Sequence, residues 1–281
     1  MTPRVHRISA WDGLALNVLE WHPDAPGTPL LCLPGLVRTA GDFAPLAAGA
    51  PRRIVALDYA GRGASFRLPP GARPDRYGPE AALRDVMDVA AALGLARVVV
   101  VGTSFGGLLA MGLAAARPGL LAGVVLNDIG PDVGTEGAAF VRRFVAHDPA
   151  LPDLAACVAH LRAILPPLSL HTEADWQAMA ALTYAPAADG RWRPLWDTRI
   201  AALLDAPPPD LWPLFGALEP FPLLVLRGAL SNILSAATLA RMGERHGAMT
   251  AVTVPDVGHA PSLAEPEVVA ALKIFLARIA P

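Results

Sequence analysis

The pentapeptide Gly-Thr-Ser-Phe-Gly at residues 102–106 has the residue types and spacing of a serine nucleophile on a sharp strand-to-helix turn. A β-branched run, Val98–Val101, precedes it, and a small, apolar stretch that ends at Arg117 follows it. Glycines on both sides of Ser104 suit a turn in which neighbouring backbones leave no room for a Cβ. Because a serine hydroxyl alone is a poor nucleophile, the site requires a base, a group that orients the base, and donors for an oxyanion.

The expected base is His259, which lies on a loop near the end of the chain. This loop, Pro255–Pro261, follows a strand-like run, Thr250–Val254. Gly258 would let the loop turn, so that one ring nitrogen of His259 could reach Ser104. The backbone N–H of Phe105, at the positive end of the following helix, is an expected oxyanion donor.

The composition narrows the class of protein. The chain has 281 residues and a net charge of −2, which gives no basic field for nucleic acid. It has no run of roughly 18 or more apolar residues, and its first residues lack the apolar centre of a signal peptide. Cys32 and Cys157 are far apart, and neither belongs to a pattern of metal ligands. We expect a soluble, cytoplasmic monomer or homodimer without metal or cofactor, which acts on a small molecule and binds no nucleic acid or membrane.

Strands and helices alternate through most of the chain, which predicts an α/β fold with a mostly parallel sheet. Two N-terminal strands are joined through Asp12-Gly13, a hairpin signal. The expected strands are Arg4–Ser9, Leu14–Trp21, Leu30–Leu33, Arg53–Leu57, Val98–Val101, Gly123–Leu126, Pro222–Arg227 and Thr250–Val254. Helices are expected at Glu80–Leu93, after Ser104, and at Pro266–Ile279.

The alternation stops between residues 132 and 212. This segment has a helical pattern, many prolines and no convincing strand, which predicts a helical cap inserted into a core made of residues 1–131 and 213–281. Pro207-Pro208-Pro209 suggests a stiff connector. The cap is rich in tryptophan, and these side chains either form its core or contact substrate. The candidates for substrate contact are Trp176, Trp192 and Trp196.

With these motifs in this order, the whole chain resembles the α/β-hydrolase fold with a cap after the sixth strand. The resemblance implies a sheet of about eight strands, with Ser104 as nucleophile and His259 as base. It also implies a second oxyanion donor after Leu30–Leu33. The family usually has His-Gly-x at that place, whereas this chain has Pro-Gly-Leu at residues 34–36, so the backbone N–H of Leu36 is the expected donor.

Two charged residues on neighbouring loops have other expected roles. Arg38, in the loop after Leu30–Leu33, could bind a substrate carboxylate or brace that loop through a salt bridge. Asp58 opens the segment Asp-Tyr-Ala-Gly-Arg-Gly at residues 58–63, which matches the family's loop after its fourth strand. We expect Asp58 to be a structural residue that binds loop amides rather than a catalytic one.

The acid that orients the histidine is the unusual feature. After Pro222–Arg227 the family has Gly-x-x-Asp, but this chain has Asn232 at the aspartate position. An amide oxygen can accept a hydrogen bond but brings no charge to stabilise an imidazolium. Asp128, directly after the sixth strand, could supply the acid instead. Otherwise Asn232 orients His259 in a slower enzyme, or the site is disabled.

The leading functional hypothesis is a serine hydrolase that cleaves small, mainly apolar carboxylic esters through an acyl-enzyme. A carbon–carbon bond hydrolase of the β-diketone type would use the same residues, with a cap arginine binding a carboxylate; Arg142, Arg143 and Arg162 are the candidates. A ligand-binding protein on a weakened hydrolase scaffold is the third alternative, and it rests on Asn232.

Overall fold

The computed structural model describes residues 2–206 and 209–279, and its centre is an eight-stranded sheet in the order β1-β2-β4-β3-β5-β6-β9-β10. The β1–β2 and β2–β4 pairs are antiparallel and the others are parallel, which confirms the predicted mostly parallel sheet and its N-terminal hairpin. The strands are β1 (Arg4–Ser9), β2 (Ala15–Trp21), β3 (Leu30–Leu33), β4 (Ile54–Leu57), β5 (Val98–Thr103), β6 (Leu121–Asn127), β9 (Leu223–Gly228) and β10 (Met249–Val254).

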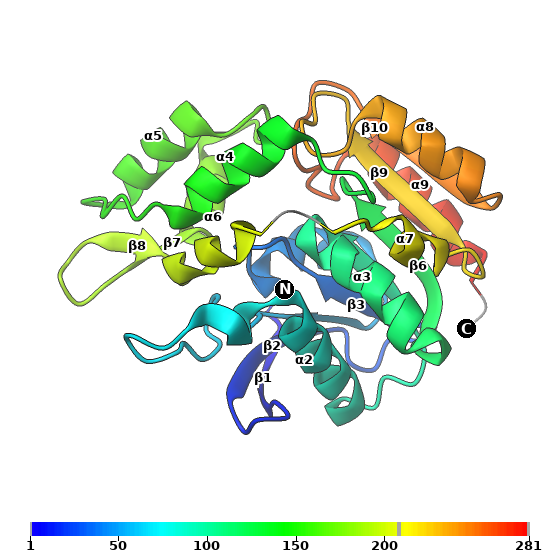
Figure 1. Cartoon of the computed structure of the whole chain (residues 1–281), viewed down its shortest axis with the longest axis horizontal. Helices are drawn as coiled ribbons and strands as arrows, with labels where there is room; N and C mark the ends of the chain where they lie inside the picture. Colours follow the sequence, from blue (N-terminus) through cyan, green and yellow to red (C-terminus); the bar gives the residue numbers. More distant parts are fainter. Residues whose placement is uncertain (1, 207–208, 280–281) are drawn as a thin grey trace.

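Helices cover both faces of this sheet (Figure 1). Strand β5 shows why: Val98 and Val100 belong to one apolar cluster, whereas Val99 and Val101 belong to another, because successive side chains point to opposite faces. Residues of α2, α3, α7 and α8 pack in the first cluster, and residues of α1 and α9 in the second. These helices are α1 (Ala44–Gly49), α2 (Pro79–Ala92), α3 (Phe105–Ala116), α7 (Trp212–Gly216), α8 (Ala236–Arg245) and α9 (Pro266–Ala277). Short 3-10 helices are η1 (Ala40–Phe43), η2 (Pro74–Tyr77) and η3 (Pro118–Leu120).

The insertion, residues 132–206 and 209–212, lies between β6 and β9 in the chain. It contains α4 (Thr135–Ala146), α5 (Leu154–Ile164), α6 (Glu173–Ala181), β7 (Tyr184–Pro186), β8 (Trp192–Pro194) and η4 (Thr198–Leu204). Figure 1 shows α4, α5 and α6 grouped at one end of the sheet. Side chains of the insertion form a third apolar cluster around Trp196 and Tyr184, which also includes Tyr77 of the core.

One expectation for the insertion is wrong. Strands β7 and β8 form a small antiparallel hairpin where the sequence suggested no strand. Each strand has three residues and ends in proline, so no alternating pattern develops, and the turn is carried by Asp189-Gly190, with Gly190 at a φ of 75°. The predicted connector at Pro207-Pro208-Pro209 lies partly outside the described residues and stays a prediction. Across residues 2–206 and 209–279, every helix is too short or too polar to cross a bilayer.

Candidate active site

Ser104 occupies a strained turn between β5 and α3. Its φ of 52° and ψ of −117° lie outside the regions that side-chain-bearing residues favour. The turn needs close backbone approach, because a Cβ on Gly106 would lie 2.0 Å from the carbonyl oxygen of Leu33. The Ser104 N–H donates to the carbonyl of Asn127 (3.0 Å), which ties the turn to the end of β6. Such strain is typical of a functional residue that the surrounding structure holds in place.

Asp128 and His259 form a hydrogen-bonded pair next to the serine turn in the chain's candidate site. Nδ1 of His259 and Oδ2 of Asp128 are 2.8 Å apart, and the Asp128 side chain is completely buried. The other carboxylate oxygen, Oδ1, accepts a hydrogen bond from the backbone N–H of Gly228 (3.0 Å). Because an ionised carboxylate only accepts, Nδ1 of His259 is the donor, and Nε2 is left to accept a proton. The His259 side chain is 16 % exposed, so its ring remains accessible.

Asn232 lies elsewhere. It is exposed on the turn between β9 and α8, and its backbone carbonyl packs against Gly134 and Gly137 at the start of α4. The structure thus pairs His259 with the post-β6 acid and does not support the alternative in which Asn232 orients the histidine. The carboxyl group that position 232 lacks is supplied at position 128.

Asn127 is a site residue that the sequence reasoning missed. Its side-chain amide donates to Oγ1 of Thr103 (3.1 Å), one residue before the serine. The same amide donates to the carbonyl of Pro261 (2.9 Å), two residues after the histidine. The backbone carbonyl of Asn127 also accepts the hydrogen bond from the Ser104 N–H, so Asn127 ties the serine turn to the histidine loop. No local motif marks Asn127, because its role depends on the pairing of β5 with β6.

The predicted oxyanion donors lie close to the serine. Phe105 is the first residue of α3, so its N–H has no acceptor within the helix. A Cβ on Gly35 would be 3.8 Å from Cβ of Ser104, which places the loop 34–36 against the serine turn. The backbone donor of Leu36 therefore belongs to the same neighbourhood.

The three tryptophans differ in their surroundings. Trp196 is only 2 % exposed, and its indole Nε1 donates to the carbonyl of Val145 (2.9 Å), so it belongs to the core of the insertion. Trp176 is half-buried beneath Arg162, whose Cζ lies 5.3 Å from the ring centroid. Trp192 is half-buried in β8. Trp196 thus fits the packing alternative, and substrate contact stays a prediction for the other two.

Arg38 and Asp58 both brace loops. The guanidinium of Arg38 forms a two-bond salt bridge with Asp42 and donates to Oγ1 of Thr183 (2.6 Å) in the insertion. This is the bracing alternative for Arg38 rather than the substrate-binding one. Asp58 accepts hydrogen bonds from the backbone N–H groups of Ala40 (2.7 Å) and Ala64 (2.9 Å), as expected for a structural residue.

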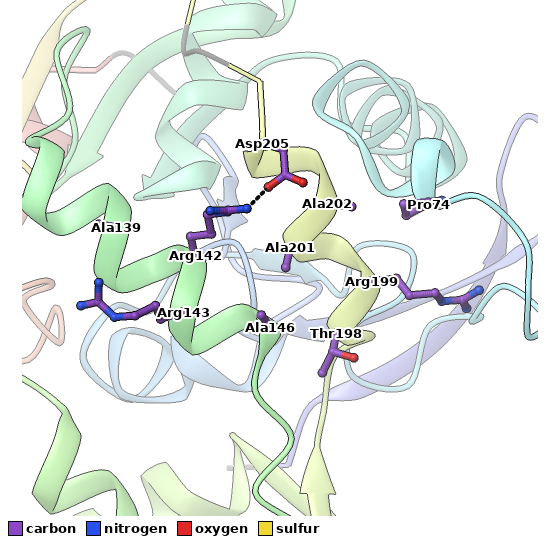
Figure 2. Close-up of a pocket in the computed structure, with 10 residues that line it drawn as sticks. All are labelled: Pro74, Ala139, Arg142, Arg143, Ala146, Thr198, Arg199, Ala201, Ala202 and Asp205. Carbon is purple, nitrogen blue, oxygen red and sulfur yellow. Dashed lines mark ion pairs between the residues drawn. The ribbon is translucent and has the colours of Figure 1, made fainter.

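A cavity of about 740 Å³ lies away from this constellation, on the insertion between α4 and η4. Figure 2 shows Arg142 and Arg143 on its α4 side and Arg199 on its η4 side. Arg142 is already paired with Asp205 (2.5 Å). Neither Ser104 nor His259 lines this cavity, so it is separate from the candidate active site.

Comparison with known proteins defines the class to which this fold and site belong. Residues 30–272 match the model of the alpha/beta hydrolase family, and the chain belongs to that family. It is 32 % identical over 264 residues to a 3-hydroxybutyrate-oligomer hydrolase of Cupriavidus necator, covering 89 % of each chain. It is 27 % identical over 259 residues to a 2-(acetamidomethylene)succinate hydrolase of Mesorhizobium japonicum, covering 91 % of this chain and 88 % of the relative. An alpha/beta hydrolase from Novosphingobium aromaticivorans, known as a crystal structure, is 37 % identical with a TM-score of 0.91, covering 99 % of this chain and all of that one (100 %).

Proposed function

We propose that this protein is a serine hydrolase that cleaves esters of short carboxylic acids, with Ser104, His259 and Asp128 as nucleophile, base and acid. The observation that carries the proposal is the 2.8 Å contact between His259 Nδ1 and Asp128 Oδ2. A buried carboxylate in this position fixes the tautomer of the ring and stabilises the imidazolium that forms when the ring takes a proton. In this proposal Asp128 supplies the negative charge that an asparagine at position 232 could not supply.

The proposed reaction has two steps. His259 Nε2 takes the proton of the Ser104 hydroxyl as the Oγ attacks the ester carbonyl, and the N–H groups of Leu36 and Phe105 bind the resulting oxyanion. The protonated ring then gives its proton to the leaving alcohol, and an acyl-serine ester remains. In the second step, water loses a proton to His259 and attacks this ester, which releases the acid and restores the serine hydroxyl.

Short hydroxy-acid oligoesters are the proposed substrate class. The Cupriavidus relative acts, by its name, on oligomers of 3-hydroxybutyrate, and these are joined by the carboxylic ester bonds that an acyl-enzyme mechanism cleaves. The small net charge of this chain, −2, and the apolar cluster of its insertion agree with a small substrate of low charge.

Other observations weaken the two alternatives. Carbon–carbon bond cleavage requires a cap arginine free to bind a carboxylate, yet Arg142 pairs with Asp205 and Arg162 pairs with Glu173 (2.7 Å). The third candidate, Arg143, forms no ion pair within the described residues, but it lines the cavity that neither Ser104 nor His259 reaches. The ligand-binding alternative rested on the missing acid at position 232. Since Asp128 contacts His259, that reason for a weakened site no longer applies.

The test is hydrolysis of the linear dimer and trimer of 3-hydroxybutyrate, followed by chromatography of the released monomer, alongside p-nitrophenyl butyrate. We expect turnover of all three esters by the native chain and none by Ser104→Ala. Turnover of the p-nitrophenyl ester alone would support the serine hydrolase and refute the oligoester substrate. Native-like turnover by Ser104→Ala would refute the mechanism.

A further inference from the structure

The loop 34–36 is held by hydrogen bonds to three consecutive carbonyl oxygens. Tyr59 Oη donates to Pro34 (3.2 Å), Arg38 N donates to Gly35 (3.1 Å), and Arg62 Nε donates to Leu36 (2.9 Å). The carbonyl of Gly35 and the N–H of Leu36 belong to the same peptide group, which the hydrogen bond from Arg38 N holds. The hydrogen bonds from Tyr59 and Arg62 hold the peptide groups before and after it. This arrangement fixes the direction of the Leu36 N–H before any substrate binds, which is the property an oxyanion donor needs.

Arg62 is the unusual member of this set. Its side chain is fully buried (0 % exposed), and its partners are backbone carbonyls: besides Leu36, Nη1 donates to Ala60 (2.7 Å) and Tyr77 (3.3 Å). Within the described part of the chain, Nη2 has no hydrogen-bond partner and no carboxylate forms an ion pair with the guanidinium. Burial lowers the pKa of Arg62 to about 10, so the group still carries its charge at neutral pH.

Aromatic rings surround this charge. The Cζ of Arg62 lies 5.7 Å from the ring centroid of Tyr59 and 5.8 Å from those of Tyr77 and Phe105. Phe105 is the residue whose N–H is the other proposed oxyanion donor. A buried cation without a carboxylate is costly to fold. This one contacts the carbonyl of Leu36 and the ring of Phe105, the two residues whose N–H groups are the proposed oxyanion donors.

The insertion holds the same segment from its other side. Gly63 N–H donates to the carbonyl of Leu195 (2.7 Å), and Asp197 N–H donates to the carbonyl of Gly61 (2.8 Å). Arg62 is therefore fixed between the insertion and the loop 34–36, and its position depends on both.

We propose that Arg62 is a positioning residue for the oxyanion hole: it holds the Leu36 N–H in its donating direction and places a positive charge beside the oxyanion. The inference deepens the proposed function and rests on it. Arg62 does not touch the substrate, so its removal should lower kcat with little change in KM. A misplaced donor of this kind can cost about 10²-fold in rate.

The test compares Arg62→Met with the native chain on a p-nitrophenyl ester and on its thionoester, in which sulfur replaces the carbonyl oxygen. Sulfur is larger and accepts hydrogen bonds poorly, so the native enzyme should strongly prefer the oxygen ester. We expect Arg62→Met to lose about 10²-fold in kcat on the oxygen ester and far less on the thionoester, so that the preference collapses. An equal loss on both esters, or no loss, would overturn the proposal.

Two further variants separate positioning from stability. Arg53→Met removes a partly buried arginine, which donates to Glu20 (2.8 Å) and to the carbonyl of Leu93 (3.0 Å). Arg53 directly precedes β4, so it lies at the amino ends of the parallel strands, away from Ser104. Arg53→Met should lower the melting temperature and leave the preference for the oxygen ester unchanged. If Arg62→Met does not fold, Arg62→Lys keeps the charge but cannot reach all three carbonyls, and its preference should fall partway. A native enzyme without any preference between the two esters would instead count against the proposed oxyanion hole itself.

Discussion

A carboxylate that meets an imidazole Nδ1 at hydrogen-bond distance keeps the ring in one tautomer and stabilises its protonated form. Asp128 is well placed for both effects, because the Gly228 N–H fixes one oxygen while His259 uses the other. Its φ of 57° is a left-handed value that aspartate tolerates better than most residues. Few other side chains could meet both the backbone and the charge requirement at this position.

At the residue scale, Asp128→Asn should remove the charge while keeping most of the shape. In the serine-protease triad, the same change lowers kcat by about 10⁴, and we expect a loss of similar order here. Asn232→Ala, the matched control on the other acid position, should keep native kcat, because that side chain is exposed. The measurement is kcat for ester hydrolysis by the native chain, Asp128→Asn and Asn232→Ala at equal concentrations of folded protein. A large loss in Asn232→Ala with native activity in Asp128→Asn would reverse the assignment.

The sequence predicts Ser104 and His259 from local patterns, since Ser104 lies in a glycine-flanked turn after a strand and His259 lies on a loop after a strand. Asp128 could only be one of several alternatives. Its role depends on the pairing of β6 with β9, which brings the Gly228 N–H to its carboxylate, and on the path of the loop after β10. Asn127 and Arg62 act through backbone carbonyls far along the chain, and no local spacing marks such contacts.

At the scale of elements, Asp197 joins the insertion to the core. Its carboxylate accepts hydrogen bonds from the Tyr77 hydroxyl (2.9 Å) and from Arg199, and its N–H bonds the carbonyl of Gly61. Burial raises the pKa of Asp197, but the hydrogen bonds from Arg199 and Tyr77 outweigh it, and the net pKa is lowered. The carboxylate thus stabilises the fold in its ionised form.

Asp197→Asn should destabilise the native chain by about 1–3 kcal/mol at neutral pH, as expected for a lost hydrogen-bonded charge. Because the folded pKa lies below the unfolded one, this stabilisation is fully present above a pH of about 4 and is lost as the pH falls through the folded value. Thermal melts of the two proteins should therefore converge under acid conditions. A gap that persists at low pH would mean that packing, not charge, stabilises the junction. The exposed Asp189→Asn is the control and should change little.

The central strands of the sheet were predictable because β3, β4 and β6 are buried along their whole length and form continuous apolar runs. The more exposed β1 was indicated by the Asp12-Gly13 hairpin signal, and both β1 and β3 have the predicted bounds. The hairpin of β7 and β8 was not predictable, since strands of three residues are too short to show an alternating pattern. The tryptophan content left both packing and substrate contact open, and Trp196 is buried in the core of the insertion. In this small insertion, large aromatic side chains such as Trp196 and Tyr184 form the apolar core.

For the whole molecule, the sheet order brings the proposed chemistry together. Ser104 follows β5, Asp128 follows β6, and His259 lies on the loop after β10, so three strands contribute from their carboxyl ends. In open α/β sheets this edge is the usual place for ligands. The insertion begins at the same edge, four residues after Asp128, and its contacts with the loop 61–63 link it to the proposed oxyanion donors.

The most direct test of the account is the identity of the residue that becomes covalently modified by a fluorophosphonate, read by intact-mass spectrometry and peptide mapping. We expect a single adduct on Ser104 in the native chain, no adduct in Ser104→Ala, and much slower labelling in Asp128→Asn than in Asn232→Ala. A native chain that takes no label at Ser104, or labelling that is as fast without the Asp128 charge as with it, would contradict the proposed mechanism.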